Sequence, residues 1–245
     1  MIQRKSARVM SSIVFIRHAQ ASLFDKNYDQ LSDLGGQQAE VLGRYLAHQR
    51  CRFDEIYIGP CRRHQQTADS VREFLGDGFP APTQIAEFDE HQVDQLVGGH
   101  VEELARQFPA VARLTRDFKA ATEDSTRRKS FARLFGSIAQ LWVGNRCPLF
   151  GLESWHDFHN RVNDGISGIV SRGGRGRRIL VLTSAGTIAV AAQRALGCSD
   201  THVLQLAWRL CNCSINSFLF SGDLFSLDQF NAMPHFSQRS EWTYM

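Results

Sequence analysis

The chain has 245 residues, of which 43% are hydrophobic and 22% are charged, and its formal net charge at pH 7 is +3. No apolar run approaches the about 20 residues of a membrane-spanning helix, and so small a positive charge argues against a nucleic-acid-binding protein. The basic N-terminus lacks the long apolar core of a secretory signal, so we expect a cytoplasmic protein with reduced cysteines.

The length allows one large core, and nothing in the composition separates two domains. We therefore expect a single domain over residues 1–245 that carries an insertion. The six cysteines have no paired spacing, and His156 and His159 lie three positions apart on a predicted helix without an evident third ligand. Neither a metal site nor a cofactor is expected.

The first predicted element is a strand over Ile13–Ile16, which is continuously apolar and mostly β-branched. Such a run is typical of a strand buried on both faces in an α/β sheet. Ser32 or Asp33 can cap the helix that follows over residues 33–49, where apolar side chains recur at helical spacing. A second strand over 53–59 and a helix from Pro60 to Leu75 repeat this βα pattern.

The segment 98–148 has no strand pattern and is interpreted as a helical insertion. We expect two helices in it, Val101–Ala121 and Ser130–Val143, separated by the polar stretch 122–130. The arginines in this segment are interpreted as a solvated face.

A third βα unit follows the insertion. Residues 152–170 form an amphipathic helix, the Gly/Arg-rich stretch 171–178 a turn, and 179–183 a doubly buried strand. The next helix is expected to be capped by Ser184 and stopped by Gly197.

The C-terminal part is expected to contain Cys211 and Cys213 on one face of a strand, and then a hairpin that turns at residues 221–223. The predicted fold class is α/β, with a mostly parallel sheet flanked by helices.

Three predicted strands end in unusual loops. The first leads to Arg17 and His18, the second to Arg62 and Arg63, and the third to residues 184–186. Ligands of open parallel sheets bind past the carboxyl ends of the strands, and guanidinium groups match phosphate geometry. A phosphoryl group is therefore the expected ligand, and the absence of a glycine-rich motif from the sequence excludes a nucleotide P-loop. Alternatively, Arg17 and His18 form a structural pair that carboxylates neutralise.

Five blocks carry a family resemblance: "FIRHAQ", "LSDLGGQQAEVLGRYL", "GPCRRHQQTA", "AEFDEH" and "LVLTSAGTIA". In this order they resemble the histidine phosphatases of the phosphoglycerate-mutase-like superfamily. The resemblance extends from about Ile13 to Phe236, with the insertion least constrained. It implies a phosphoglycerate-mutase-like fold and a metal-independent phosphomonoesterase.

By this resemblance His18 is the nucleophile, and Arg17 and Arg63 hold the phosphoryl oxygens. Arg63 is preferred to Arg62 because it stands four residues before Thr67, as the pocket arginine of the family does, and Arg62 is expected to face solvent. A neutral imidazole has a reference pKa of about 6.5, and neighbouring arginines lower this value and keep a lone pair available for attack.

The resemblance places the proton donor for the leaving group at Glu87, with Glu90 as the second choice. A cluster of carboxylates is expected to raise the pKa of one member, which suits an acid that works near neutral pH. Ser22, Ala185 and Gly186 complete the predicted substrate-binding residues.

Ala185 departs from the family, which usually has a second phosphate-contacting histidine at this place. Loss of one preorganised donor commonly lowers a rate by about 10²–10³, so the activity is expected to be weakened but not abolished. His91 and His64 are the candidates to replace it. Ala19 stands where a glycine is usual and requires only a negative φ. Phe24, in place of the asparagine of many mutases, favours a phosphatase.

The sequence therefore predicts a phosphatase whose partner is a small phosphorylated substrate, with no nucleic acid and no membrane. The insertion 98–148 is expected to form a lid or wall that selects the substrate, and the oligomeric state stays open. Two alternatives remain: a weakened relative that binds a phosphorylated ligand without turnover, and a phosphoglycerate-type mutase.

Overall fold

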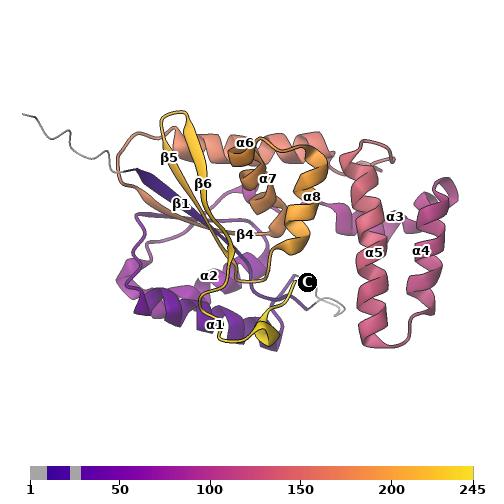
Figure 1. The fold of residues 1–245 in the computed structure, drawn as a ribbon, viewed down its shortest axis with the longest axis horizontal. Helices are drawn as coiled ribbons and strands as arrows, with labels where there is room; N and C mark the ends of the chain where they lie inside the picture. Colours follow the sequence, from indigo (N-terminus) through magenta and orange to yellow (C-terminus); the bar gives the residue numbers. More distant parts are fainter. Residues whose placement is uncertain (1–9, 23–28, 245) are drawn as a thin grey trace, which may run out of the picture.

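A six-stranded sheet forms the centre of the computed structural model, which describes residues 10–22 and 29–244 (Figure 1). The strand order is β3-β2-β4-β1-β5-β6. The strands are β1 (Ser11–Arg17), β2 (Glu55–Ile58), β3 (Thr83–Gln84), β4 (Arg178–Thr183), β5 (Ile215–Ser221) and β6 (Leu224–Ala232). The first four pair in parallel, and β5 and β6 form an antiparallel hairpin at one edge. The predicted α/β class and the hairpin are confirmed.

Helices cover both faces of this sheet. They are α1 (Asp33–His48), α2 (Arg62–Leu75), α6 (Trp155–Val170), α7 (Ala185–Leu196) and α8 (Asp200–Arg209), with short 3-10 turns η1 (Gly76–Gly78), η2 (Ala86–Phe88) and η3 (Arg239–Glu241). On one face, α1 and α2 bury Leu42 and Val71 against Ile16 and Leu182. The other face carries α6 and α7 and is continuous with the core of the insertion (Figure 1). Because helices cover both faces of the sheet, strands such as β4 are apolar on both faces.

The predicted helix caps are confirmed in their positions. The Ser32 side chain accepts a hydrogen bond from Gly35 N, and Gly197 ends α7 in the left-handed conformation with a φ of 65°. Ser184 occupies the N-cap of α7, but its side chain makes no capping bond. Its hydroxyl instead lies 2.7 Å from His64 Nε2, so this residue connects two elements of the site.

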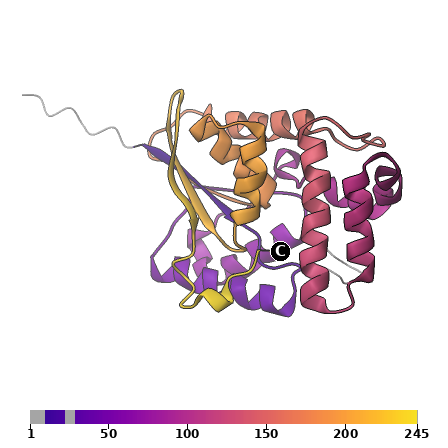
Figure 2. The same ribbon diagram turned by 45° about the vertical axis from the view of Figure 1, so that its right-hand side comes forward.

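The insertion contains three helices where the sequence analysis expected two: α3 (Val93–Gln107), α4 (Pro109–Ala120) and α5 (Asp124–Val143) (Figure 2). The predicted helix Val101–Ala121 is broken because Pro109 disfavours helical geometry at Phe108, whose φ and ψ are −123° and 106°. The predicted polar separator 122–130 is also wrong in part. Most of it forms the first turns of α5, which solvent-exposed charged side chains do not prevent.

Two further predictions fail after α7. The helix α8 was not expected, and Cys211 and Cys213 lie in a turn before β5 rather than on a strand. Cys213 has a φ of 61°, which a strand does not allow, although both thiols are buried as expected. Phe24 lies outside the described residues. No helix in the described part of the chain could cross a membrane.

Two adjacent glycines in α1 give a stability prediction. A methyl group on Gly35 would lie 2.0 Å from the backbone oxygen of Gln20, whereas one on Gly36 would meet nothing within 4 Å. Gly35→Ala should therefore lower the free energy of unfolding by about 1–3 kcal/mol through overpacking. Gly36→Ala should raise it by about 0.5–1 kcal/mol, because alanine favours a helix. Urea denaturation of both variants measures this, and equal effects would contradict the close approach at Gly35.

Candidate active site

The sheet order brings the three chemically unusual strand ends together. β4 lies between β1 and β2, with Arg17 in register with Thr183 and Ile58 with Leu182. The loops after these strands therefore leave the sheet at the same edge, where α2 and α7 begin. The strands are neighbours, as the predicted convergence of Arg17 and Arg63 requires.

One ring nitrogen of His18 is hydrogen-bonded to a carbonyl oxygen, and the other is hydrogen-bonded to an arginine. Its Nδ1 lies 2.7 Å from the Ala19 carbonyl oxygen, and Arg63 Nε donates to its Nε2 at 3.2 Å. Because a carbonyl only accepts and a guanidinium only donates, we assign the proton to Nδ1 and the lone pair to Nε2. The side chain is a neutral imidazole whose free lone pair lies on Nε2.

The surroundings of His18 keep it neutral. Burial lowers its pKa well below the usual value, and the charges of Arg63 and Arg17 lower it further. His18 is only 4% exposed. The imidazole therefore keeps its lone pair at neutral pH, as the sequence analysis expected.

The two arginines are held by different partners. Arg63 NH1 forms an ion pair with Asp29 at 2.8 Å, and its NH2 lies 4.0 Å from Glu90. Arg17 NH1 donates to the carbonyl oxygens of Leu210 and Tyr244, each at 2.6 Å. Both guanidinium groups are buried and fixed. Asp29 balances part of the Arg63 charge, yet Arg63 still contacts His18.

Arg62 and Arg63 point in different directions, as predicted. Arg62 is exposed, and only its backbone N–H is used, by Asp29 at 2.9 Å. No sequence pattern predicted that Asp29 would contact Arg62 and Arg63, because α1 and β2 lie between it and α2.

Hydrogen bonds from two other loops fix the backbone around His18. Thr67 Oγ1 accepts from Ala19 N at 3.1 Å and donates to the Arg63 carbonyl oxygen at 2.8 Å. This pair of bonds is the physical reason why the arginine four residues before Thr67 faces His18. Asn212 Nδ2 donates to the His18 carbonyl oxygen at 3.0 Å. Ala19 has no positive φ, so it fits where the family usually has glycine.

Glu90, not Glu87, lies with the arginines. Glu90, Arg17 and Arg63 line one cavity of about 930 Å³, and Glu87 is absent from the described lining. Glu87 packs against α6, where its Cβ is 2.7 Å from the position that a side chain on Gly165 would occupy. The structure therefore places Glu90, and not Glu87, beside the two arginines, and the role of Glu87 stays a prediction.

Arg161 of α6 organises the loop that carries Glu90. It is paired with Glu153 at 2.7 Å, and its NH1 donates to the carbonyl oxygens of Ala86, Glu87 and Asp89 at 3.0–3.3 Å. The sequence analysis did not identify this residue. Its position in an ordinary amphipathic helix gave no sign that it holds a loop 70 residues or more earlier in the chain.

Small residues at the start of α7 make room for Glu90 and His91. A side chain on Gly186 would lie 2.9 Å from His91 Cδ2 and 3.0 Å from Glu90 Oε1. His91 lines the cavity together with Ala185 and Gly186. His64 is fully buried between Ser184 and His18, and its ring centroid is 5.5 Å from that of His18. Both candidate replacements for the missing histidine thus approach its place.

The electrostatics of Glu90 differ from expectation. Burial raises its pKa, but the opposing charges of His91 and Arg63 leave the pKa below its usual value. The predicted rise of a carboxylate pKa is therefore not found for this residue. A bound phosphate would add negative charge beside Glu90 and shift its pKa upward.

Ser22 and His156, which the sequence analysis discussed, are not among the described residues that line the cavity. Ser22 is buried and donates its backbone N–H to the Gln30 carbonyl oxygen at 3.1 Å, and its contact with a substrate stays a prediction. His156 is exposed on α6. Within residues 10–22 and 29–244, no three histidine, cysteine or carboxylate side chains are grouped as in a metal site.

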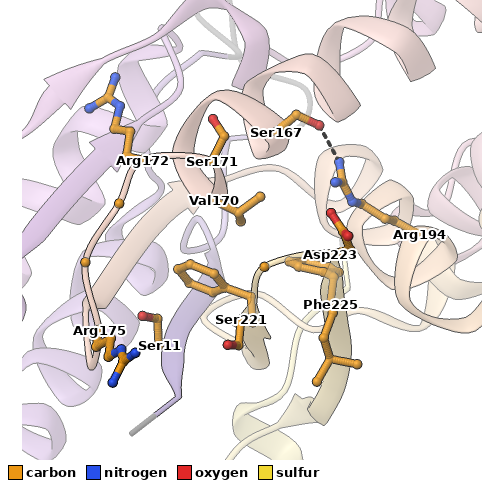
Figure 3. A pocket seen from close by; sticks show the side chains of 15 residues that line it. Ser11, Ser167, Val170, Ser171, Arg172, Arg175, Arg194, Ser221, Asp223 and Phe225 are labelled. Carbon is orange, nitrogen blue, oxygen red and sulfur yellow. Dashed lines mark hydrogen bonds between the residues drawn. The ribbon is translucent and has the colours of Figure 1, made fainter. Parts of the chain in front are cut away.

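A second hollow lies at the opposite end of β1, where Ser11 begins the strand (Figure 3). The Gly/Arg-rich turn and the tip of the β5–β6 hairpin line it. Its arginines do not converge, since Arg194 stands on one side and Arg172 and Arg175 on the other (Figure 3). The described lining of this hollow contains no histidine or cysteine, so the His18 chemistry has no counterpart there.

Comparison with known proteins agrees with this geometry. The family model of the histidine phosphatase superfamily (branch 1) matches residues 13–135 and 122–233. The mitochondrial serine/threonine-protein phosphatase Pgam5 of Caenorhabditis elegans is 34% identical over 77 residues, which cover 31% of this chain and 27% of that protein. The match thus spans little more than a quarter of that relative.

Solved structures share the fold over nearly the whole chain. The phosphoglycerate mutase of Bacillus anthracis has a TM-score of 0.62 and 16% identity, with 95% of this chain and 97% of that chain covered. The phosphoserine phosphatase of Entamoeba histolytica has a TM-score of 0.62 and 18% identity, with 92% and 99% covered.

The buried histidines predict acid sensitivity. Burial lowers the pKa of His64 to about 3, whereas the unfolded chain has a value of about 6.5. Protons therefore bind the unfolded state first as the pH falls below 6.5, and stability decreases by up to about 1.4 kcal/mol per pH unit for each such histidine. Urea denaturation between pH 7.5 and 5.0 should show a smaller slope in His64→Asn than in the original chain. The exposed-site control His156→Asn should keep the original slope, and an unchanged slope in His64→Asn would contradict a neutral buried His64.

Proposed function

The chain belongs to the histidine phosphatase superfamily, and from this premise we propose that it is a metal-independent phosphomonoesterase with a phosphohistidine intermediate on His18. The observation that carries the proposal is the His18 Nε2 lone pair, which faces Arg63 Nε at 3.2 Å beside the cavity that Arg17 also lines. A neutral nucleophile among fixed cations matches the transfer of a phosphoryl dianion.

In the first step, His18 Nε2 attacks phosphorus while the bond from phosphorus to the leaving oxygen breaks. The Nε–H of Arg63 moves from the lone pair to a phosphoryl oxygen, so the same donor that marks the resting nucleophile stabilises the transition state. Arg17 supplies the second guanidinium. Water then attacks the phosphohistidine and releases inorganic phosphate, which restores the free imidazole.

Glu90 is the proposed acid for the leaving oxygen, in place of Glu87. It lines the cavity and lies 4.0 Å from Arg63 NH2. Its resting pKa is low, but the phosphate dianion raises it on binding, so that Glu90 takes up a proton and then donates it. In the second step the carboxylate accepts a proton from the attacking water.

His91 is the proposed replacement for the histidine missing at Ala185. It reaches the cavity beside Gly186, and its Nε2 lies 3.6 Å from Glu90 Oε1. His64 has a different role. Fully buried and bonded to Ser184, it positions the start of α7 and contacts no substrate.

The proposed partner is a small phosphorylated substrate, and the proposed location is cytoplasmic. The alternative function, a weakened relative that binds a phosphorylated ligand without turnover, rests on Ala185. A mutase is the third possibility, because a phosphoglycerate mutase shares the fold.

Hydrolysis of p-nitrophenyl phosphate tests the proposed reaction. The original chain should release phosphate, and His18→Asn should remove all turnover because no other group replaces Nε2 as the nucleophile. His156→Asn is the matched control on an exposed histidine and should retain the full rate. Phosphate binding without turnover in the original chain would favour the non-catalytic alternative. Turnover that persists in His18→Asn would contradict the proposed nucleophile.

The choice of acid is tested with two leaving groups. Glu90→Gln should lower kcat/KM for an alkyl phosphate such as ethyl phosphate by about 10²-fold, since general acids contribute about 10²–10⁴. The loss should be smaller for p-nitrophenyl phosphate, whose leaving group needs no proton. Glu87→Gln is the control with the same charge change. A larger loss in Glu87→Gln than in Glu90→Gln would restore the original assignment.

A further inference from the structure

The cavity that Arg63 and Glu90 share continues away from His18 into the helical insertion. It measures about 930 Å³, which is the size of a site for a drug-sized ligand. A phosphoryl group held by Arg17 and Arg63 would fill only its inner end. The remaining space must accommodate the leaving group, so its lining indicates the chemistry of that group.

The outer part of the cavity is mostly apolar and comes from helices far apart in sequence, with Arg133, Ser137 and Gln140 of α5 as its polar members. α5 lies beside α8 in both views of the fold (Figures 1 and 2). The apolar side chains that line this part are Leu114, Phe131, Phe135, Leu204, Ala207 and Trp208. Burial of such exposed apolar surface by a ligand is favourable, because it removes the surface from water.

Trp208 forms a shaped wall rather than a loose surface group. A side chain on Gly136 would lie 2.3 Å from Trp208 Cη2, so the absence of one lets the indole ring lie directly on α5. Trp208 nevertheless remains 44% exposed to solvent. On the inner side, Phe135 lies 6.0 Å from the His91 ring, measured between centroids. The aromatic wall is therefore continuous with the residues that surround the phosphoryl group.

We propose that this cavity selects phosphomonoesters whose leaving alcohol is bulky and apolar, with Trp208 and Phe135 as specificity-determining residues. This inference rests on the proposed function, because it concerns the same site. Small polar leaving groups such as serine or glycerate would leave most of the aromatic wall exposed to water. An aromatic or extended apolar alcohol covers the wall and keeps its phosphate on the arginines.

Two alkyl phosphates with comparably basic leaving oxygens provide the test. 2-(1-Naphthyl)ethyl phosphate should have a kcat/KM at least about 100-fold higher than that of ethyl phosphate, because the naphthyl ring is buried in the transition state. In Trp208→Ala this ratio should fall about tenfold, while Trp208→Phe should retain most of it. Leu196→Ala, which removes an exposed apolar side chain outside the cavity, should leave the ratio unchanged.

Binding of the matching phosphonates, which cannot be hydrolysed, separates this inference from the proposed reaction. Calorimetric titration should give a Kd for the naphthylethyl phosphonate about 100-fold lower than for ethylphosphonate. Equal Kd values, or no binding of either compound, would overturn the selectivity. Turnover of both phosphates with a ratio near one would also overturn it and leave the phosphatase proposal intact. Selective phosphonate binding without any turnover would instead support the selectivity and contradict the proposed reaction.

Discussion

The hydrogen bond from Arg63 Nε to His18 Nε2 is the interaction on which the site depends. A guanidinium cannot accept a hydrogen bond, so this contact exists only while Nε2 has a free lone pair. The Ala19 carbonyl fixes the proton on the opposite nitrogen. Burial and two arginines then lower the pKa of the ring and hold it neutral, which keeps the Nε2 lone pair available in the resting state.

Sheet order and small side chains make this arrangement possible. With β4 between β1 and β2, the loops that carry His18, Arg63 and Ala185 leave one edge together. Gly186 then admits Glu90 and His91 to the space beside α7. His91 therefore lines the cavity together with Ala185, where the family resemblance implies a histidine. Asp29 and Arg161 support the arrangement from outside by fixing Arg63 and the Glu90 loop.

Local patterns predicted those parts of the molecule that local physics determines. Continuous apolar runs identified β1, β2 and β4. The buried arginine was identified by the family resemblance, and the structure adds that one helical turn links Arg63 to Thr67. The choice between Glu87 and Glu90 depends on the turn η2 and on Arg161 of a distant helix, which no local pattern shows. Asp29 and the pairing of α5 with α8 likewise arise from contacts between remote segments. Within the insertion, the break at Pro109 was present in the sequence and should have divided the predicted helix.

The central claim is that His18 Nε2 receives the phosphoryl group. Rapid quenching of the protein during turnover of a phosphomonoester, followed by mass spectrometry of its peptides, tests this claim most directly. The account predicts a phosphate on the peptide that contains His18, stable to alkali and lost in acid, as a phosphorus–nitrogen bond requires. Phosphate on another residue, or turnover with no phosphoenzyme under conditions that trap a control phosphohistidine, would contradict it.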